Sequence, residues 1–472
     1  MFFRQYYLGC LAHASYLFGD PASGRAAVVD PQRDVDQYLD DAKALGLEVT
    51  DVFLTHFHAD FVAGHLELQA RTGATIHLGA RASAEYDFQP AADGARVQLG
   101  AVEIETLETP GHTPESICLL VSDRNEPQRP AALLTGDTLF IGDVGRPDLM
   151  ASAGHSADEL ARFLYRSLHE KILVLPDETL VYPAHGAGSM CGRNLSTETV
   201  STLGTQRLYN YALRPMSEEE FVSAVTRNLP TVPAYFAYDA ETNRKLHPTL
   251  DEQLARALRP MSVAENRTAR ASNGIVLDVQ DAEEHAAAHW AGAINIGLGG
   301  KYATWAGSLL DRTGIALIAD PGQEEEAATR LGRIGFDHVV GYLRGMAALR
   351  EHRSGSRSSK TRDGARSPRR EPTRKPLPWV LDIRSPVERE TASIAGTPGI
   401  PLDELPARAR RGSAGPAGGD PLRGRLSPMI AASLLRRAGS RRSTTSSAAS
   451  PRGSSPDSRL LRSTPRDERT EP

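Results

Sequence analysis

Histidine and aspartate side chains gather in one short segment of the sequence and recur at three later points. His56, His58 and Asp60 lie in the segment THFHADFVAGH (55–65), directly after a hydrophobic run. Three later candidate ligands each stand beside small, turn-forming residues at the end of an apolar run: His112, Asp137 and His185. Neutral imidazoles and carboxylates are the ligands that a borderline divalent metal prefers in proteins. The residue types and their order therefore predict a metal centre.

Six histidines outside these segments are expected to be satisfied polar groups or surface residues, because each is isolated from the motifs. They are His13, His77, His155, His169, His247 and His289.

The elements that must position the candidate ligands follow from hydrophobic periodicity. Predicted strands cover Ala26–Asp30, Val49–Thr55, Val97–Leu107 and Ala131–Thr135, and predicted helices cover Asp34–Leu45 and Ser156–Leu168. Loops at strand ends commonly carry metal and catalytic groups, because a rigid sheet holds them in place. The first 250 residues are therefore predicted to form a mixed α/β domain with its chemistry at the strand ends.

The order of motifs HxHxD, GH, GD and AHG resembles the metallo-β-lactamase superfamily over about residues 1–240. This resemblance implies an αββα sandwich with metal bound between the sheets. Two branches of the superfamily fit: hydrolases of the glyoxalase II type and persulfide dioxygenases. The hydrolases usually carry HxHxDH and bind two metals that activate a hydroxide. Phe61 stands at the place of the last histidine, which removes one ligand of the second metal.

The dioxygenase branch implies one Fe(II) per chain, held by His56, His112 and Asp137. Two histidines and one carboxylate form a facial arrangement that leaves positions for O₂ and substrate. The resemblance then gives three other side chains a catalytic role in orienting ligands or water: His58, Asp60 and His185. The runs FIGDVGRPDL (140–149) and YPAHGAGSMCG (182–192) are also similar to persulfide dioxygenases, in particular those fused to rhodanese domains.

Two further residues are candidates for substrate binding. By similarity Arg146 helps to hold the thiol substrate, and the alternative is an arginine that braces its loop. Cys191 lies beside the His185 segment, so it is either a reactive thiol near the metal or a small packed hydrophobic residue. Cys10 and Cys118 lie in apolar strand-like segments and are expected to be structural.

The second half of the chain contains two segments that resemble the rhodanese pattern, 277–298 and 380–405. Rhodaneses transfer sulfur through a cysteine thiolate in a loop of backbone N–H groups. Asp320 stands at the corresponding place of the first unit, and no cysteine follows Cys191, so neither unit is expected to transfer sulfur. The second unit is expected to be incomplete. The predicted domains are 1–250 (dioxygenase), 261–352 (degenerate rhodanese-like), 353–377 (basic linker) and 378–472 (incomplete rhodanese-like with a basic tail).

Charge divides the 472 residues unevenly. The residues from Arg350 onward hold 26 basic and 13 acidic side chains, whereas the whole chain has a net charge of -5. This basic region contains almost no aromatic residues that could stack on bases, so a solvated disordered tail is predicted and nucleic-acid binding is not. A second interpretation is that a frameshift in the gene produced this basic region. Codons can be chosen for residues 443–453 that, read two bases later, encode HDVVGGFAAW. That peptide resembles the end of a rhodanese domain.

The sequence predicts no membrane partner, because no apolar run reaches the roughly 18–20 residues of a membrane span. With three cysteines and no secretory signal, a reducing, cytoplasmic location is expected. The predicted partners are O₂ and a small persulfide, such as glutathione persulfide, and a homo-oligomer stays open.

Three functions are compatible with these motifs: persulfide dioxygenase, glyoxalase II type thioester hydrolase, and non-enzymatic sulfur-relay scaffold. Phe61 favours the first over the second, and the complete iron triad favours the first over the third.

Overall fold

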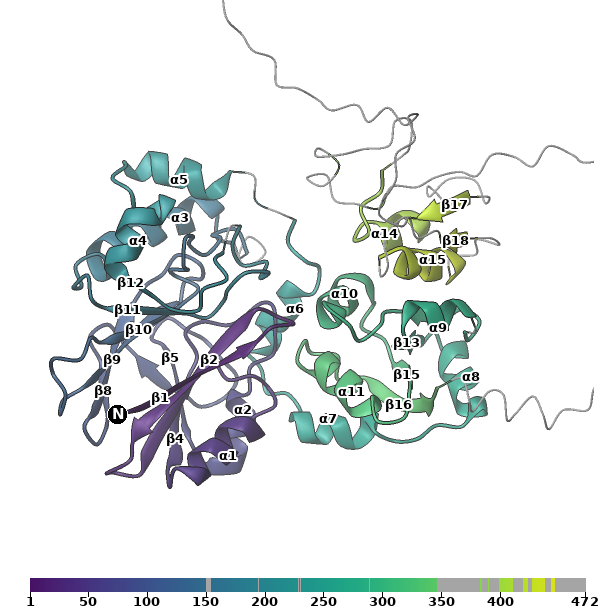
Figure 1. The fold of residues 1–472 in the computed structure, drawn as a ribbon, viewed down its shortest axis with the longest axis horizontal. Helices are drawn as coiled ribbons and strands as arrows, with labels where there is room; N and C mark the ends of the chain where they lie inside the picture. Colours follow the sequence, from purple (N-terminus) through teal and green to yellow (C-terminus); the bar gives the residue numbers. More distant parts are fainter. Residues whose placement is uncertain are drawn as a thin grey trace, which may run out of the picture. The chain divides into compact units, whose positions relative to one another are not determined.

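The computed structural model forms two compact units (Figure 1). The described residues are 1–149, 154–193, 195–227, 229, 231–287 and 289–345, followed by 383, 389, 399–410, 419–422, 427–437 and 443–445. The first unit comprises Met1–Arg256 together with Gly300–Ser308 and Ala328–Asp337. The second unit comprises Ala257–Gly299, Leu309–Ala327 and the described residues from His338 onward.

Two six-stranded sheets build the first unit. The first sheet runs in the order β1-β2-β3-β4-β5-β6, with the bounds Phe2–Leu8, His13–Asp20, Arg25–Val29, Glu48–Phe53, Thr75–Gly79 and Gln89–Ala91. The second runs in the order β12-β11-β10-β9-β8-β7, with the bounds Ser201–Thr202, Leu180–Pro183, Ala132–Gly136, Ile117–Asp123, Val102–Glu108 and Arg96–Leu99. Strands β3 to β6 are parallel, as are β10 and β11, so their carboxyl ends lie at one edge of each sheet.

Strand alternation explains how the second sheet is buried on both faces. Along β9, Ile117, Leu119 and Val121 belong to the core between the two sheets. Cys118, which points to the opposite face, belongs to a second core with the helices that cover this sheet. Side chains alternate between the faces of a strand, and a fully buried aliphatic side chain contributes about 1.5–3 kcal/mol. An apolar strand such as β9 is therefore stable only inside a sandwich.

Helices cover the outer face of each sheet. Helices α1 (Asp36–Ala44) and α2 (His65–Thr72) pack on β4. Helix α3 (Ala157–Ser167), which continues into the π-helical turn η2 (Leu168–Ile172), shares the second core with α5 (Glu218–Thr226). The predicted αββα sandwich is thereby confirmed. Shorter elements complete this part of the unit: α4 (Leu203–Tyr209) and η3 (Tyr211–Leu213).

The predicted strands and helices of the first 250 residues are found, with one difference. The predicted strand Val97–Leu107 is a hairpin, in which β7 and β8 pair in antiparallel fashion. Gly100 has a φ of +63° in the turn between them. This conformation suits glycine, because it lacks a Cβ atom.

Three further helices belong wholly or largely to the first unit: α6 (Phe236–Thr242), α7 (Leu250–Ala257) and α10 (Tyr302–Leu309). The segment Ala328–Asp337 is tied to the N-terminal part of the unit by Arg33, whose side chain is fully buried. Its guanidinium pairs with Asp337 at 2.6 Å and Glu67 at 3.1 Å. Residues about 300 positions apart are thus joined by a buried ion pair.

The second unit contains a parallel four-stranded sheet in the order β14-β13-β15-β16. Its strands are Ile294–Asn295, Ile275–Asp278, Ile315–Ala319 and Val339–Arg344. Three helices lie along this part of the chain: α8 (Val263–Ala271), α9 (Ala282–Ala287) and α11 (Glu324–Gly332). The predicted small α/β arrangement is confirmed, and its rhodanese-like character stays a prediction.

The structure describes only short pieces beyond residue 345. They are α14 (Leu405–Arg410), β17 (Gly419–Leu422), α15 (Ser427–Arg437) and β18 (Ser443–Thr445). The basic linker and most of the rhodanese-like segment 380–405 lie outside the described residues, as does most of the segment with the proposed frame shift. Among the helices of the described ranges, none is long and apolar enough to span a bilayer.

Candidate metal centre

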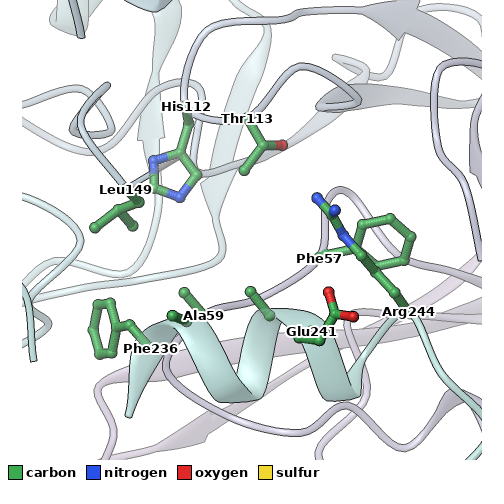
Figure 2. Close-up of a pocket in the computed structure, with 10 residues that line it drawn as sticks. Phe57, Ala59, His112, Thr113, Leu149, Phe236, Glu241 and Arg244 are labelled. Atoms are coloured by element: carbon green, nitrogen blue, oxygen red, sulfur yellow. The ribbon is translucent and has the colours of Figure 1, made fainter. Parts of the chain in front are cut away.

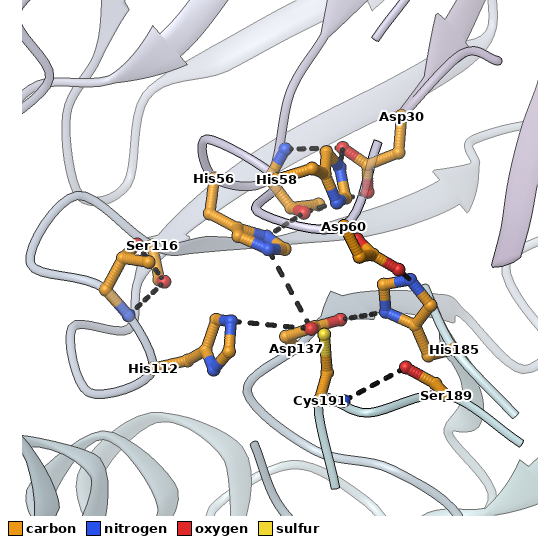
Figure 3. Close-up of polar contacts among 12 residues, drawn as sticks. Asp30, His56, His58, Asp60, His112, Ser116, Asp137, His185, Ser189 and Cys191 are labelled. Carbon is orange, nitrogen blue, oxygen red and sulfur yellow. Dashed lines mark hydrogen bonds and ion pairs between the residues drawn. The ribbon is translucent and has the colours of Figure 1, made fainter. Parts of the chain in front are cut away.

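The predicted ligands come together at the strand ends of the two sheets (Figure 3). His56, His58 and Asp60 follow β4, whereas His112, Asp137 and His185 follow β8, β10 and β11. All six side chains are buried. Gly145 permits the close packing, because a Cβ atom there would lie 1.9 Å from the carbonyl oxygen of Asp137 and 3.0 Å from Nδ1 of His112. The sequence prediction that these segments share one site is confirmed.

Three of these side chains direct potential ligand atoms at one another. The potential ligand atoms of His56, His112 and Asp137 all lie within 4.8 Å of one another. Oδ2 of Asp137 is 3.8 Å from Nε2 of His56 and 3.4 Å from Nε2 of His112. Neither Asp137 Oδ2 nor His56 Nε2 has a hydrogen-bond partner among the residues that the structure describes. Because an unsatisfied buried polar atom is costly, this arrangement fits a bound metal ion.

Hydrogen bonds at the other ring nitrogen orient both imidazoles for metal binding. His112 Nδ1 lies 2.9 Å from the carbonyl oxygen of Arg146 and can only donate to it. His56 Nδ1 lies 3.0 Å from Oγ1 of Thr55, whose hydroxyl donates to Asp30. Each Nε2 therefore keeps its lone pair toward the centre. Burial also lowers the pKa of His56 and His112, which favours the neutral form that a metal requires.

His185 is held between two carboxylates. Its Nδ1 donates to Oδ1 of Asp137 at 2.7 Å, and its Nε2 lies 2.9 Å from Oδ2 of Asp60. Burial opposes protonation, but Asp137 and Asp60 outweigh it and hold the pKa of His185 well above its usual value. Burial would likewise raise the pKa of Asp137, but His185 and His56 hold it well below the ordinary range. His185 thus lies between the carboxylates of Asp137 and Asp60.

His58 also has a carboxylate neighbour, since its Nε2 lies 2.9 Å from Oδ1 of Asp30. The potential ligand atoms of His58, Asp60 and His185 lie within 4.8 Å of one another as well. The centre therefore contains a second donor group beside the first, and buried atoms of both groups lack a hydrogen-bond partner among the described residues.

Phe61 fills the place beside this second group. Its buried ring lies 4.4 Å from the ring of His58 and 4.1 Å from that of His13, measured between centroids. The expectation that His13 is a satisfied or surface residue is wrong. It is fully buried, and neither ring nitrogen has a hydrogen-bond partner in the described part of the chain. His13 begins β2, a strand that is buried throughout, and it forms a backbone bridge with His185.

Two other histidines lie outside the centre. His77 is satisfied, because its Nε2 lies 2.8 Å from Oδ1 of Asp51. His65 begins α2, and its Nδ1 lies 3.2 Å from the carbonyl oxygen of Ala63. Although His65 follows the ligand segment closely, its ring packs on Tyr86.

Arg146 is buried and engaged by its own loop. Its guanidinium forms two hydrogen bonds of 2.7 Å with Asp148 and donates to the carbonyl oxygen of Met190 at 3.3 Å. Its backbone N–H donates to the carbonyl oxygen of Cys191. These contacts favour the bracing role, since Arg146 connects the loop that orients His112 with the loop that carries Cys191.

The thiol of Cys191 faces the metal centre (Figure 3). Its sulfur and the potential ligand atoms of Asp137 and His185 lie within 4.8 Å of one another. Burial and the nearby carboxylates of Asp60 and Asp137 raise the pKa of this thiol well above its usual value. Cys118 is also buried, but it lies in β9, and burial raises its pKa to about 11. Cys191 is therefore placed to contact a ligand at the centre.

A pocket opens onto one of the candidate metal ligands (Figure 2). It encloses about 500 Å³, including the part open to solvent. The lining residues are Phe57, Ala59, His112, Thr113, Leu149, Phe236, Ala237, Ala240, Glu241 and Arg244. A ligand in this pocket would reach His112.

Helix α6, which lines the pocket, is fastened to the ligand loop by Asn243. Its Nδ2 donates to the carbonyl oxygens of His58 and Phe61 at 2.8 Å each, and its Oδ1 accepts from the N–H of Ala63 at 2.9 Å. Asn243 is fully buried. Asn243 and Arg244 were not singled out from the sequence, because no motif around them marks a site.

Comparisons with known proteins agree with this geometry. The family model of the metallo-β-lactamase superfamily matches residues 8–185. The chain is 33% identical over 222 residues to a protein named persulfide dioxygenase ETHE1 from Bos taurus, covering 46% of this chain and 77% of that protein. It is 32% identical over 232 residues to a hydroxyacylglutathione hydrolase from Rhodospirillum rubrum, covering 48% of this chain and 80% of that protein.

A solved structure extends the likeness. A metallo-β-lactamase from Staphylococcus aureus matches with a TM-score of 0.66 and 30% sequence identity, covering 73% of this chain and 99% of that chain. The αββα sandwich, the clustered ligands at its strand ends and these matches agree with one another. The chain belongs to the metallo-β-lactamase superfamily.

Proposed function

We propose that this protein is a persulfide dioxygenase that uses one Fe(II) ion held by His56, His112 and Asp137. In the overall reaction, a persulfide RSSH, O₂ and water yield the thiol RSH, sulfite and two protons. The sulfur–sulfur bond breaks, the outer sulfur is oxidised and O₂ is reduced. Glutathione persulfide is the substrate that we expect.

The observation that carries this proposal is the cluster of His56, His112 and Asp137 beside a phenylalanine at the place of a second-metal ligand. His56 and Asp137 turn unpartnered atoms toward the centre, and His185 lies beside them between Asp137 and Asp60. Phe61 supplies no ligand where a second metal would need one. Two imidazoles and one carboxylate suit a single non-haem iron with open coordination positions.

Bound iron would supply the redox chemistry by which O₂ oxidises the outer sulfur. The chain's own residues provide the surroundings. Phe61 and the buried neighbours of the centre exclude bulk water, which strengthens polar interactions there. His185 keeps a proton on Nδ1 toward Asp137 and thereby fixes the orientation of that carboxylate. Cys191 contributes one wall of the site, and Arg146 holds the loop that carries it.

The named relative from Bos taurus supports the oxidation chemistry, because its name is that of a persulfide dioxygenase. Thioester hydrolysis is the second candidate. It is supported by the relative from Rhodospirillum rubrum and by the close grouping of His58, Asp60 and His185, which could provide a second metal site. The second metal of such hydrolases would need a histidine at position 61, where this chain has a phenylalanine, and this argues against thioester hydrolysis.

The two candidates predict different reactions for the same protein. We expect the anaerobically purified, iron-containing full-length protein to consume O₂ and release sulfite when glutathione persulfide is added. S-lactoylglutathione should be hydrolysed slowly or not at all, including after zinc is added. Rapid hydrolysis of the thioester without persulfide-dependent O₂ uptake would contradict the proposal and favour the hydrolase.

A further inference from the structure

The pocket beside His112 contains one cationic group that no part of the proposed reaction uses. Arg244 follows the last residues of α6 and lies on the lining of the pocket (Figure 2). Its guanidinium carbon is 5.0 Å from the centroid of the Phe57 ring. Arginine over an aromatic face is attracted to it and loses part of its freedom, so Phe57 holds the guanidinium in place.

Arg244 lacks the carboxylate partner that such a group usually has. No ion pair joins it to an acidic side chain in the described ranges, and its buried Nε has no hydrogen-bond partner there. The nearest acidic residue on the lining, Glu241, is paired with Lys245 at 2.9 Å. The pocket therefore presents a positive group with unused donors to a bound molecule.

The rest of the lining favours a polar contact at this point. Phe57, Ala59, Leu149 and Phe236 are apolar, and a charge-assisted hydrogen bond is stronger in such surroundings than in water. The planar guanidinium matches a carboxylate with two parallel N–H donors. A ligand that reaches both ends of the lining would place an anionic group at Arg244 and its sulfur near His112.

We propose that Arg244 binds a carboxylate of the thiol that carries the persulfide, so that the enzyme selects carboxylate-bearing persulfides over neutral ones. This inference rests on the proposed function for the nature of the sulfur group. Recognition of the carboxylate itself needs neither oxygen nor turnover, so it can be tested separately.

The test is binding of S-methylglutathione to the full-length iron-containing protein under anaerobic conditions, measured by titration calorimetry. This probe keeps the carboxylates of glutathione but has no free thiol. We expect Arg244→Gln to raise its Kd about ten- to 100-fold, as the loss of a charge-assisted bond does. Arg244→Lys should recover part of the affinity. Arg124→Gln, the same substitution at an exposed arginine outside the lining, should change the Kd less than about twofold.

The dimethyl ester of S-methylglutathione is the matched ligand without carboxylate charge. It should bind the wild-type protein more weakly than the acid and bind Arg244→Gln with the same affinity as wild type. Unchanged iron content and thermal midpoint in Arg244→Gln would show that this variant folds. Equal binding of acid and ester, no binding of S-methylglutathione, or an unchanged Kd in Arg244→Gln would overturn the inference. Tighter, Arg244-dependent binding of S-methyl-coenzyme A would assign the site to phosphate instead.

The two proposals fail in different ways. Arg244-dependent binding without persulfide-dependent O₂ uptake would refute the dioxygenase and retain the carboxylate site. Oxygen uptake with a KM for glutathione persulfide that does not depend on Arg244 would retain the dioxygenase and refute the carboxylate site.

Discussion

Single residues at the metal centre differ in whether a protein partner already occupies their polar atoms. His56 and Asp137 each leave one atom without a partner in the described structure, and His112 keeps one ring nitrogen directed at them. His185 directs Nδ1 at Asp137 in a hydrogen bond of 2.7 Å, and its Nε2 lies 2.9 Å from a carboxylate oxygen of Asp60. We expect His56, His112 and Asp137 to hold a metal and His185 to orient one of these ligands.

Substitutions should separate these two roles. Replacing His112 or Asp137 by alanine removes one of three ligands, so both iron binding and O₂ consumption should be lost. His185→Ala should keep close to the wild-type iron content while turnover falls about ten- to 100-fold, because an orienting group is removed. Iron analysis and oxygen-electrode assays on the same preparations measure both effects. Loss of iron from His185→Ala would show that His185 is itself a ligand.

The sequence identified these residues because each lies in a short motif of its own. The burial of His13 could not be predicted in this way, because no motif surrounds it. Its neighbours in the sequence are those of an ordinary buried strand, and only the fold brings it to Phe61 and His185. Arg244 and Asn243 likewise stand in no motif that indicates a site. Their roles depend on where α6 packs, which hydrophobic periodicity does not determine.

Among the elements, helix α6 couples the pocket to the ligand loop. Asn243 at its end satisfies two carbonyl oxygens and one N–H group of the loop that follows His56. Loops that carry ligands need such anchors, because their backbone groups have no partners in a sheet. The pocket wall and the metal ligands are thus held by one buried amide.

Removing this amide should weaken both the fold and the metal site. Asn243→Ala leaves three buried backbone groups unsatisfied, which should lower the free energy of unfolding by about 2–4 kcal/mol. Iron affinity should fall as well, because the ligand loop loses its anchor. Urea unfolding of the metal-free protein and iron titration measure the two effects. Asn125→Ala, in an exposed turn, is the control, and equal stability of the two variants would contradict this role.

At the scale of the whole molecule, the first unit is assembled from distant parts of the chain. The predicted boundary near residue 250 follows a local change in pattern, whereas the unit also includes Gly300–Ser308 and Ala328–Asp337. The short sequence around Arg33 gives no sign that its partner lies at Asp337, because long-range ion pairs leave no periodic signal. The fold class could be predicted from local patterns, but the inclusion of these distant segments in the first unit could not.

Arg33 should therefore contribute strongly to stability. Arg33→Met leaves Glu67 and Asp337 without their buried cation, and breaking a buried pair in this way costs about 3–5 kcal/mol. Arg25→Met is the matched control, since its pair with Asp51 involves an arginine that is 45% exposed and should contribute about 0–1 kcal/mol. Chemical unfolding of both variants tests this, and similar midpoints would refute it.

The proposed dioxygenase activity requires a single metal ion at His56, His112 and Asp137. The most direct test is the metal content of the full-length protein purified without oxygen, measured by mass spectrometry against protein concentration. We predict close to one iron per chain, lost in Asp137→Ala and retained in Asp60→Asn. Two metal ions per chain, with one of them lost in Asp60→Asn, would contradict the single-iron centre.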